Sequence, residues 1–539
     1  MSASKTSFVA ALAVLLAFRP AIAQGEINAS QLGGVVEVAA VGALDHTEAN
    51  LPSSLWSGSD RAVVAQLVAE LPARIASPAL ADLTRRALAV SAKPPAGEPL
   101  VPNFAHARAE GLLRIGQTGL AARLLAGLPK AGRDESSELL LINASLLNRD
   151  VAGACEVARG RVGRAESAEF AKVNAFCDVL SGDISRAHFS AAVVAELAPD
   201  DSAYFELLGV LFHEGTKTGP AIANLVNPSP LHRTMLSTAS LSPDILPAGG
   251  LPDPNAPDAV AVEMLLATDP TTASGLRQEA GRYAIQANAM DFEGARQLFM
   301  MVGESDTPFN LANIIRMPPG PERVVAIERL LTLGRDSGAA ATTAKLILPI
   351  LTNLSVVETA PEVAREISRS LILAAELDAA GLWLDQLQSN ASVPNALDEA
   401  VKLEQVMAIA SGRDLKPFTG EEALRWIRAS GTDNIAEKAF LLRKLRQSVG
   451  LAESPVLEAV GLVKEVSHVL PSNDIIPLQT SAAENRVGET ILRAVKLVSA
   501  GDIADQHLRL AAASRALFDI GLADEAKQIA AESAVMGGL

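Results

Sequence analysis

The sequence predicts an all-α fold, an α-solenoid of antiparallel helical hairpins stacked one on the next. Three observations predict it. First, turns and apolar residues recur every 33 residues between positions 103 and 222. Second, hydrophobic residues make up 49% of the chain and aromatic residues only 4%, so most of the apolar side chains are aliphatic ones that suit closely packed helices. Third, the alternation typical of strands is nearly absent, and residues 35–38 are the single candidate.

The first 23 residues have the pattern of a secretory signal peptide. Lys5 supplies a positive start, residues 8–17 form an apolar stretch, and Ala21-Ile22-Ala23 places small residues before a cleavage site. The apolar stretch is too short to cross about 30 Å of hydrocarbon, although an uncleaved anchor remains the alternative. We therefore expect cleavage after Ala23, a periplasmic or secreted location, and no integral membrane segment in the mature protein.

Proline-rich stretches divide the rest of the chain. Residues 24–102 are expected to hold a pair of helices that ends in a proline-rich linker, and residues 103–227 hold the regular repeats. Residues 228–257 contain seven prolines, a density that excludes a normal helix and predicts a linker, or else an extended segment that a partner binds. Residues 258–539 are expected to form an irregular helical-repeat domain, with hairpins such as 280–289 with 293–302, 368–376 with 379–387, and 505–520 with 523–533.

The 33-residue repeat is defined by positions that keep their character from one unit to the next. The turns begin at residues 33 apart, namely Gly116, Arg149, Gly182 and Gly215. Alanines lie five residues after the first three turns, at Ala121, Ala154 and Ala187. Apolar residues lie seven positions before each turn, at Ala109, Ile142, Ala175 and Leu208. A single hairpin cannot bury its apolar face alone, so such units are expected to stack.

This spacing resembles the tetratricopeptide repeat (TPR) family. Gly182, Ala187 and Pro199 match the family's turn, its small residue and its closing proline, and Tyr204 corresponds to the aromatic residue of the next first helix. The proline position is not kept at Arg133 or Glu166. The resemblance implies a TPR-like superhelix whose concave face, formed by first helices, binds peptide segments.

The two cysteines are expected to form a disulfide. Cys155 lies early in one second helix and Cys177 late in the next first helix. If these helices are antiparallel about a turn near residues 162–166, residues whose numbers sum to about 329 face each other, and 155 + 177 = 332 lies within one helical turn of that value. The disulfide would join adjacent repeats and contribute about 3 kcal/mol, and two buried free thiols are the alternative.

No motif predicts catalysis, a metal site or a cofactor. The seven histidines include no His-Glu-x-x-His pattern and no pair four residues apart, and phosphate-binding and nucleophile-elbow motifs are missing from the sequence. A net charge of −16 argues against nucleic-acid binding. Soluble lytic transglycosylases place a catalytic domain on an α-superhelix, and Glu166-Ser167 and Glu532-Ser533 resemble their Glu-Ser motif. The family's Gly-Leu-Met-Gln segment does not follow either pair.

These observations favour a periplasmic scaffold with a protein or peptide partner. If the TPR resemblance holds, the residues that line the concave groove are Asn103, His106, Glu110, Arg114, Asn143, Lys172 and Phe176. Arg114 and Lys172 among amide side chains would suit a carboxylate or a peptide backbone. The alternatives are a cell-wall-active enzyme of lytic-transglycosylase-like architecture and a structural spacer in an envelope complex.

Overall fold

Helices account for the regular structure of this chain. The computed structural model describes residues 40–160, 167–212, 219–302, 311–356, 363–389, 395–418, 420–431, 434–452, 455, 457–458, 472–500 and 505–539. These ranges contain 27 α-helices and a few short 3₁₀ turns, and no strand occurs in them, so the predicted all-α class is confirmed. The predicted signal peptide and the candidate strand at 35–38 lie outside the described residues.

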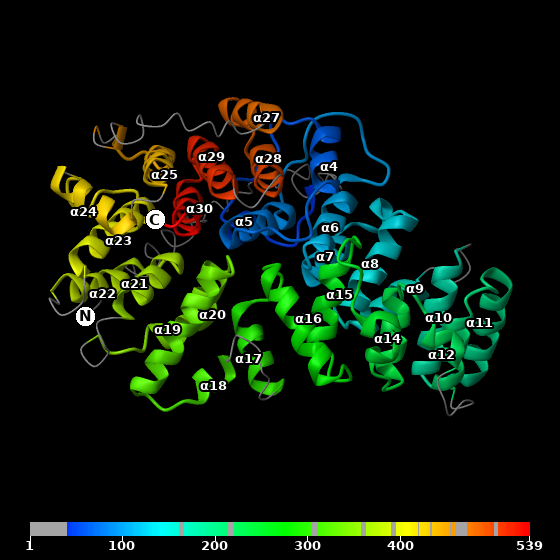
Figure 1. Cartoon of the computed structure of the whole chain (residues 1–539). Coiled ribbons are helices and arrows are strands. Elements are labelled where there is room, and N and C mark those ends of the chain that lie inside the picture. The colour runs from blue at the N-terminus through cyan, green and yellow to red at the C-terminus, as the bar shows by residue number, and fades with distance from the viewer. Residues whose placement is uncertain are drawn as a thin grey trace, which may run out of the picture. The chain divides into compact units, whose positions relative to one another are not determined.

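The helices follow one another with short connections (Figure 1). The first part of the chain forms α3 (His46–Ala49), α4 (Arg61–Ala69), α5 (Pro78–Ala89), α6 (Phe104–Arg114), α7 (Thr118–Ala126), η2 (Lys130–Gly132), α8 (Glu135–Leu147), α9 (Val151–Arg159), α10 (Ala168–Leu180), α11 (Ile184–Leu197), α12 (Ser202–Leu211) and α13 (Pro220–Ala223). The middle forms α14 (Pro230–Thr238), η3 (Pro243–Ile245), η4 (Pro247–Gly250), α15 (Ala259–Thr268), α16 (Ser274–Gln286), α17 (Phe292–Val302), α18 (Leu311–Arg316), α19 (Pro321–Asp336) and α20 (Ala340–Leu351). The last part forms α21 (Ala364–Leu373), α22 (Leu377–Ser389), α23 (Ala396–Ser411), α24 (Gly420–Ser430), α25 (Ile435–Ser448), α27 (Ser472–Ala483), α28 (Val487–Ser499), α29 (Gln506–Asp519) and α30 (Ala523–Met536).

The 33-residue units are helical hairpins, as predicted. Helices α6 and α7, α8 and α9, and α10 and α11 pack as consecutive pairs. The turn residues Gly116, Arg149 and Gly182 all have positive φ, at 78°, 61° and 75°. This left-handed conformation ends a helix and is easiest for glycine, which explains the two glycines. The alanines five residues later are fully buried, because a small side chain lets the second helix approach the first. The three later hairpins are also present, as α16 with α17, α21 with α22, and α29 with α30.

The predicted disulfide is confirmed. Cys155 on α9 and Cys177 on α10 are bonded, with their Cα atoms 5.7 Å apart. Both cysteines are buried in the core that α8, α9, α10 and α12 share. The cross-link therefore joins the second helix of one repeat to the first helix of the next, which is the place that the repeat register gave it.

The proline-rich stretch 228–257 contains a helix, so the prediction that its prolines exclude one is wrong. Helix α14 begins at Pro230, where proline costs nothing because the first helical residue has no N–H partner in the helix. Leu231, Met235 and Leu236 of α14 are buried in the same core as Tyr204 of α12. Two 3₁₀ turns follow and use Pro243 and Pro247 at their first positions. The segment is thus packed structure rather than an extended linker.

Residues Val38–Leu539 form one compact unit. Within this unit, the helices near the start pack against the helices near the end. Helix α28 contacts both α4 and α5, and α30 contacts α5 (Figure 1). The amide of Gly488 donates to the carbonyl of Leu55 at 2.8 Å, and Arg86 pairs with Glu525 at 2.8 Å. An open stack of repeats does not predict such contacts, because its first and last units touch only their neighbours.

Candidate functional site

The residues predicted for the concave groove mostly hold the fold together. Phe176 is 0% exposed and lies in the core beside the disulfide, so it offers no surface to a ligand. Asn103 caps α6 by accepting from the amide of His106 at 3.0 Å, and its amide group donates to the carbonyl of Gly132. His106 is itself buried, with Nδ1 3.3 Å from the hydroxyl of Ser137. These positions of the first helices therefore face neighbouring helices rather than solvent.

Lys172 is held by two carboxylates. Its Nζ lies 2.8 Å from an oxygen of Glu169 and 2.8 Å from Oδ2 of Asp201. Burial alone would lower the pKa of Lys172, but these two partners outweigh it and leave the pKa above its ordinary value. Lys172 is buried, and its ammonium group is engaged by these carboxylates inside the protein rather than presented to a ligand.

Two members of the predicted set remain accessible. Asn143 and Glu110 are exposed, and Glu110 lies 3.3 Å from Nε2 of His106, an interaction that lowers the pKa of Glu110. Arg114 is partly buried, and its Nε atom is buried without a hydrogen-bond partner. Only a minority of the predicted groove could therefore meet a partner.

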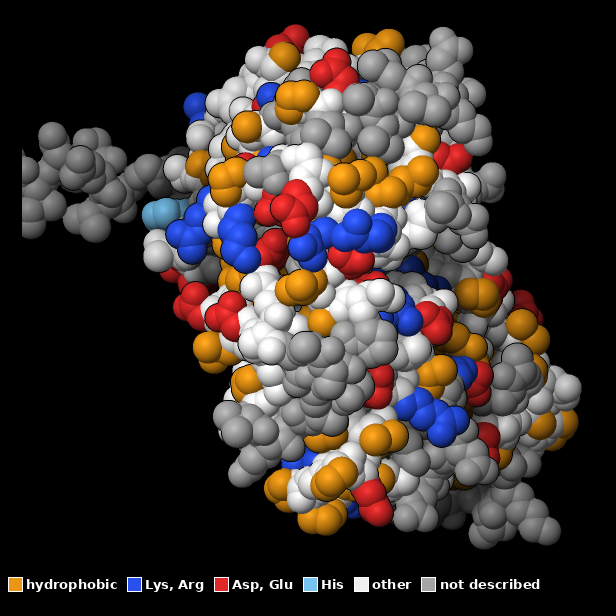
Figure 2. Space-filling view, turned by 60° about the vertical axis from the view of Figure 1, so that its left-hand side comes forward, with side chains coloured by type: hydrophobic (Ala, Val, Ile, Leu, Met, Phe, Trp, Pro, Cys, Tyr) orange, Lys and Arg blue, Asp and Glu red, His pale blue; other side chains and the backbone are white. Residues whose placement is uncertain are grey.

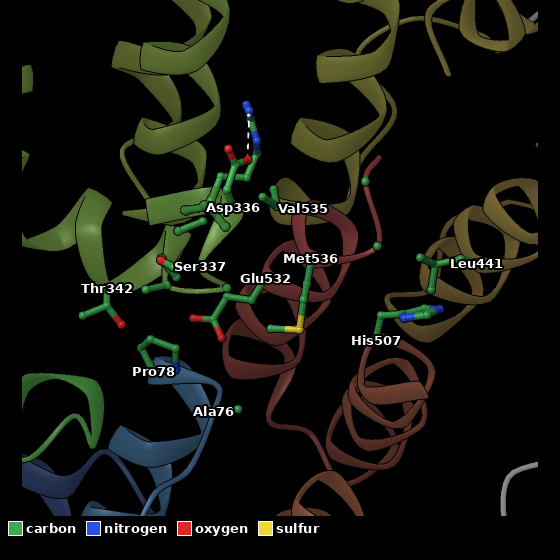
Figure 3. Close-up of a pocket in the computed structure, with 18 of the residues that line it drawn as sticks. Ala76, Pro78, Asp336, Ser337, Thr342, Leu441, His507, Glu532, Val535 and Met536 are labelled. Atoms are coloured by element: carbon green, nitrogen blue, oxygen red, sulfur yellow. Dashed lines mark hydrogen bonds and ion pairs between the residues drawn. The ribbon is translucent and has the colours of Figure 1, made fainter. Parts of the chain in front are cut away.

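A cavity lies where α5, the α19–α20 turn, α25, α29 and α30 converge. We call it the junction pocket; it has a volume of about 670 Å³, and its wall includes Ala76, Pro78, Ser337, Thr342, Lys438, Leu441, His507, Glu532 and Met536. Figure 3 shows Glu532 and Met536 projecting from α30, with Pro78 on one side and the α19–α20 turn with Ser337 on another. Sequence reasoning missed this pocket because its walls come from segments that lie far apart in the chain.

Glu532 is the most deeply buried acid of the junction pocket, at 3% exposed. One carboxylate oxygen accepts from the amide of Ala79 at 3.1 Å, and the other accepts from the hydroxyl of Ser77. Burial raises the pKa of Glu532, and the nearby Lys345 and the two hydrogen bonds only partly oppose this. Because Ser77 and Ala79 lie at the start of α5, Glu532 acts as a helix cap supplied from the far end of the chain.

The rim of the junction pocket is polar and partly made of backbone. The turn between α19 and α20 passes through Gly338, whose φ is +74° and whose α-carbon faces open space. Lys438 on α25 reaches the carbonyl of Ser430 at 2.5 Å, and Asn434 and Glu437 lie beside it in the wall. With Pro78, Leu441 and Met536 as apolar surface, the pocket offers both apolar contact and hydrogen-bonding groups. Sites that bind small molecules or peptide side chains commonly combine these features.

A smaller cavity, which we call the cationic recess, adjoins the junction pocket. Its volume is about 250 Å³, and its lining consists of Arg335, Arg365, Glu366, Arg369, Glu399, Lys402, Val535, Gly538 and Leu539. Arg335, Val535 and Gly538 line both cavities. Figure 2 views the side that carries α21–α24 and shows Lys and Arg side chains gathered in a band, with Asp and Glu side chains among them.

A third polar cluster joins the first turns of α12 and α14. Ser229 Oγ lies 2.9 Å from Nδ1 of His232, and Nε2 of His232 lies 3.2 Å from Oδ1 of Asp201. The order Ser–His–Asp is that of a hydrolase triad, but the ring nitrogens are exchanged, because a triad serine lies at Nε2 and the aspartate at Nδ1. Each oxygen, however, also caps a helix, since Ser229 accepts from the amide of His232 and Asp201 accepts from the amide of Tyr204. Helix capping thus accounts for the geometry of the cluster.

Comparison with known proteins identifies no relative of this chain. No helix in the part of the chain that the structure describes is long and apolar enough to cross a membrane. No protein-family model, no curated protein and no solved structure matches the chain.

Proposed function

We propose that this chain is an exported, TPR-like interaction scaffold of the periplasm, and that the junction pocket receives a segment of its protein partner. The predicted signal peptide supports the location, and the 33-residue hairpins support the class of protein. The proposal keeps the protein or peptide partner expected from the sequence but moves its binding site from the first helices of the repeats to the junction pocket.

The junction pocket is the single observation that carries the proposal. A volume of about 670 Å³ lies within the range of ligand sites, which runs from roughly 300 to 1,000 Å³. Its apolar side chains would accommodate a partner's side chain, while the backbone of the α19–α20 turn and Asn434 would satisfy the partner's peptide groups. The predicted groove has no comparable accessible set of residues.

The test fills the pocket without disturbing its walls. Ser337 is exposed and caps the C-terminal end of α19, and its hydroxyl donates to the carbonyl of Gly334 three residues earlier. We expect Ser337→Trp to reduce capture of a stoichiometric partner from envelope extract by at least about tenfold. Ser181 is the matched control, because it ends α10, bonds to the carbonyl of Asp178 in the same way, and also precedes a left-handed glycine.

The outcome separates the scaffold from its alternatives. Equal capture by wild type and Ser337→Trp would move the partner's site away from the junction pocket. The buried acid Glu532 favours one second candidate, a cell-wall-active enzyme that uses this residue as a general acid. That candidate predicts release of soluble fragments from peptidoglycan, with loss of the release in Glu532→Gln. The scaffold proposal predicts no release by either protein.

A further inference from the structure

The cationic recess contains more positive than negative charge. Its lining carries four cations, Arg335, Arg365, Arg369 and Lys402, against the two carboxylates Glu366 and Glu399, so 4 − 2 leaves an excess of two. The whole chain, by contrast, has a net charge of −16. A local excess of the opposite sign is therefore a specific feature of this place.

The three arginines of the recess share one carboxylate. Oε1 of Glu366 lies 2.5 Å from Arg335, 2.6 Å from Arg369 and 3.3 Å from Arg365. A single oxygen cannot satisfy three guanidinium groups, each of which has five N–H donors. The Nε atom of Arg365 is buried and makes no well-formed hydrogen bond, and Glu399 is 3.9 Å away from that arginine. Donor capacity therefore remains around the cavity.

Lys402 has no carboxylate of its own. In the described residues no ion pair or hydrogen bond engages its ammonium group, although the side chain is only partly exposed. Burial lowers the pKa of Lys402, and nearby Arg369, Lys438 and Arg365 lower it further, while only Glu399 opposes this. Like charges held together in a partly buried site cost free energy unless an anion joins them.

We infer that the cationic recess binds a carboxylate group of the peptide segment that lies in the junction pocket. The inference rests on the proposed function, since Arg335, Val535 and Gly538 line both cavities and so place the recess next to the junction pocket. A carboxylate accepts two parallel N–H bonds from a guanidinium fork, and a cavity of about 250 Å³ holds such a group with a few waters. Lys402 supplies the remaining positive charge.

The experiment uses probes of known chemistry on the full mature protein. Ligand-observed NMR at low salt would measure binding of acetyl-pentaalanine with a free carboxyl terminus, of the same peptide as its amide, of succinate, and of inorganic phosphate. We expect the free acid to bind at least about tenfold more tightly than the amide, with succinate as its competitor. Lys402→Gln and Arg365→Gln are each expected to weaken the free acid about tenfold.

Lys130→Gln is the control for these variants, because Lys130 is exposed on η2 and far along the chain from the recess. Equal affinity of wild type and Lys402→Gln for the free acid, or no binding of any probe at millimolar concentration, would overturn the inference. Binding of phosphate without binding of either carboxylate probe would overturn the assignment to a carboxylate. Succinate binding that depends on Lys402 would support the recess even if Ser337→Trp still captures the protein partner, so the two proposals can fail separately.

Discussion

Gly488→Ala tests the packing of α28 against the segment that holds Trp56, near the start of Val38–Leu539. Gly488 is the second residue of α28, and its amide donates to the carbonyl of Leu55. A β-carbon placed there would lie 2.3 Å from Cε3 and 2.5 Å from Cζ3 of Trp56. Trp56 is fully buried, and its ring packs edge-on against Phe104 with centroids 5.6 Å apart. The ring therefore has little room to retreat.

Two effects of opposite sign decide the size of the change. Forcing one methyl group into a packed core costs about 1–3 kcal/mol. Replacing glycine by alanine in a helix gains up to about 1 kcal/mol, and less in the first turn. The packed arrangement therefore predicts a net loss of about 1–2 kcal/mol in the free energy of unfolding. Without contact between α28 and Trp56, only the gain in helix propensity remains, and the variant becomes more stable than wild type.

The assay is urea unfolding under oxidising conditions, followed by tryptophan fluorescence and by far-UV circular dichroism. Gly275→Ala is the matched control, because Gly275 is likewise the second residue of its helix, α16, and a β-carbon there meets no atom within 4 Å. We expect the control to be as stable as wild type or slightly more stable. A Gly488→Ala protein that behaves like the control would refute the packing of α28 on Trp56.

Three further predictions concern the disulfide, the buried Glu532 and the hydroxyl of Ser229. Replacing both Cys155 and Cys177 by alanine should lower the free energy of unfolding by about 3 kcal/mol, as measured by urea unfolding, because the bond closes a loop with a sequence separation of 22. Since burial raises the pKa of Glu532, the unfolded chain ionises first as pH rises above about 4.5, and stability linked to this group is lost as pH rises through the folded pKa. Glu532→Gln should therefore gain stability relative to wild type between pH 4.5 and neutrality, and a constant difference across that range in thermal unfolding would contradict the raised pKa. Because capping explains the bonds of Ser229, a fluorophosphonate probe should not label it; labelling seen by mass spectrometry and abolished in Ser229→Ala would reveal a nucleophile.

Local signals predicted the helical hairpins well. Each signal belongs to one hairpin and its neighbour, so it recurs wherever the hairpin recurs. The signals are a left-handed turn, a buried alanine five residues later, and apolar residues before the turn. The disulfide followed from the same register. Helix α14 was missed for a local reason as well, because a count of prolines does not reveal that Pro230 stands at the first position of a helix, where the ring fits.

Several residues predicted for the groove are buried, because the sequence does not show which face of a first helix is covered. Lys172 and Phe176 lie one turn apart on α10, and both are used inside the protein, one in an ion-pair cluster with Asp201 and one in the core. The neighbouring helices α9 and α11 both pack on α10, and α12 supplies Tyr204, whose hydroxyl donates to the carbonyl of Lys172. A charged or aromatic residue at a concave position is therefore not enough to indicate a binding surface.

The junction pocket depends on where α5 lies, and both ends of that helix are held by buried ionisable side chains from elsewhere. Glu532 accepts from the amide of Ala79 at the start of α5, and Arg108 donates to the carbonyl of Leu88 at its end, at 2.8 Å. Burial lowers the pKa of Arg108 to about 10, yet the residue stays protonated at neutral pH. An acceptor at the N-terminus and a donor at the C-terminus satisfy backbone groups that a helix leaves unpaired at its two ends. An acid such as Glu532 among the aliphatic residues and the one serine of stretch 529–535 is the sequence signal for such a contact. Its partner can be identified only when the fold brings together residues 453 positions apart.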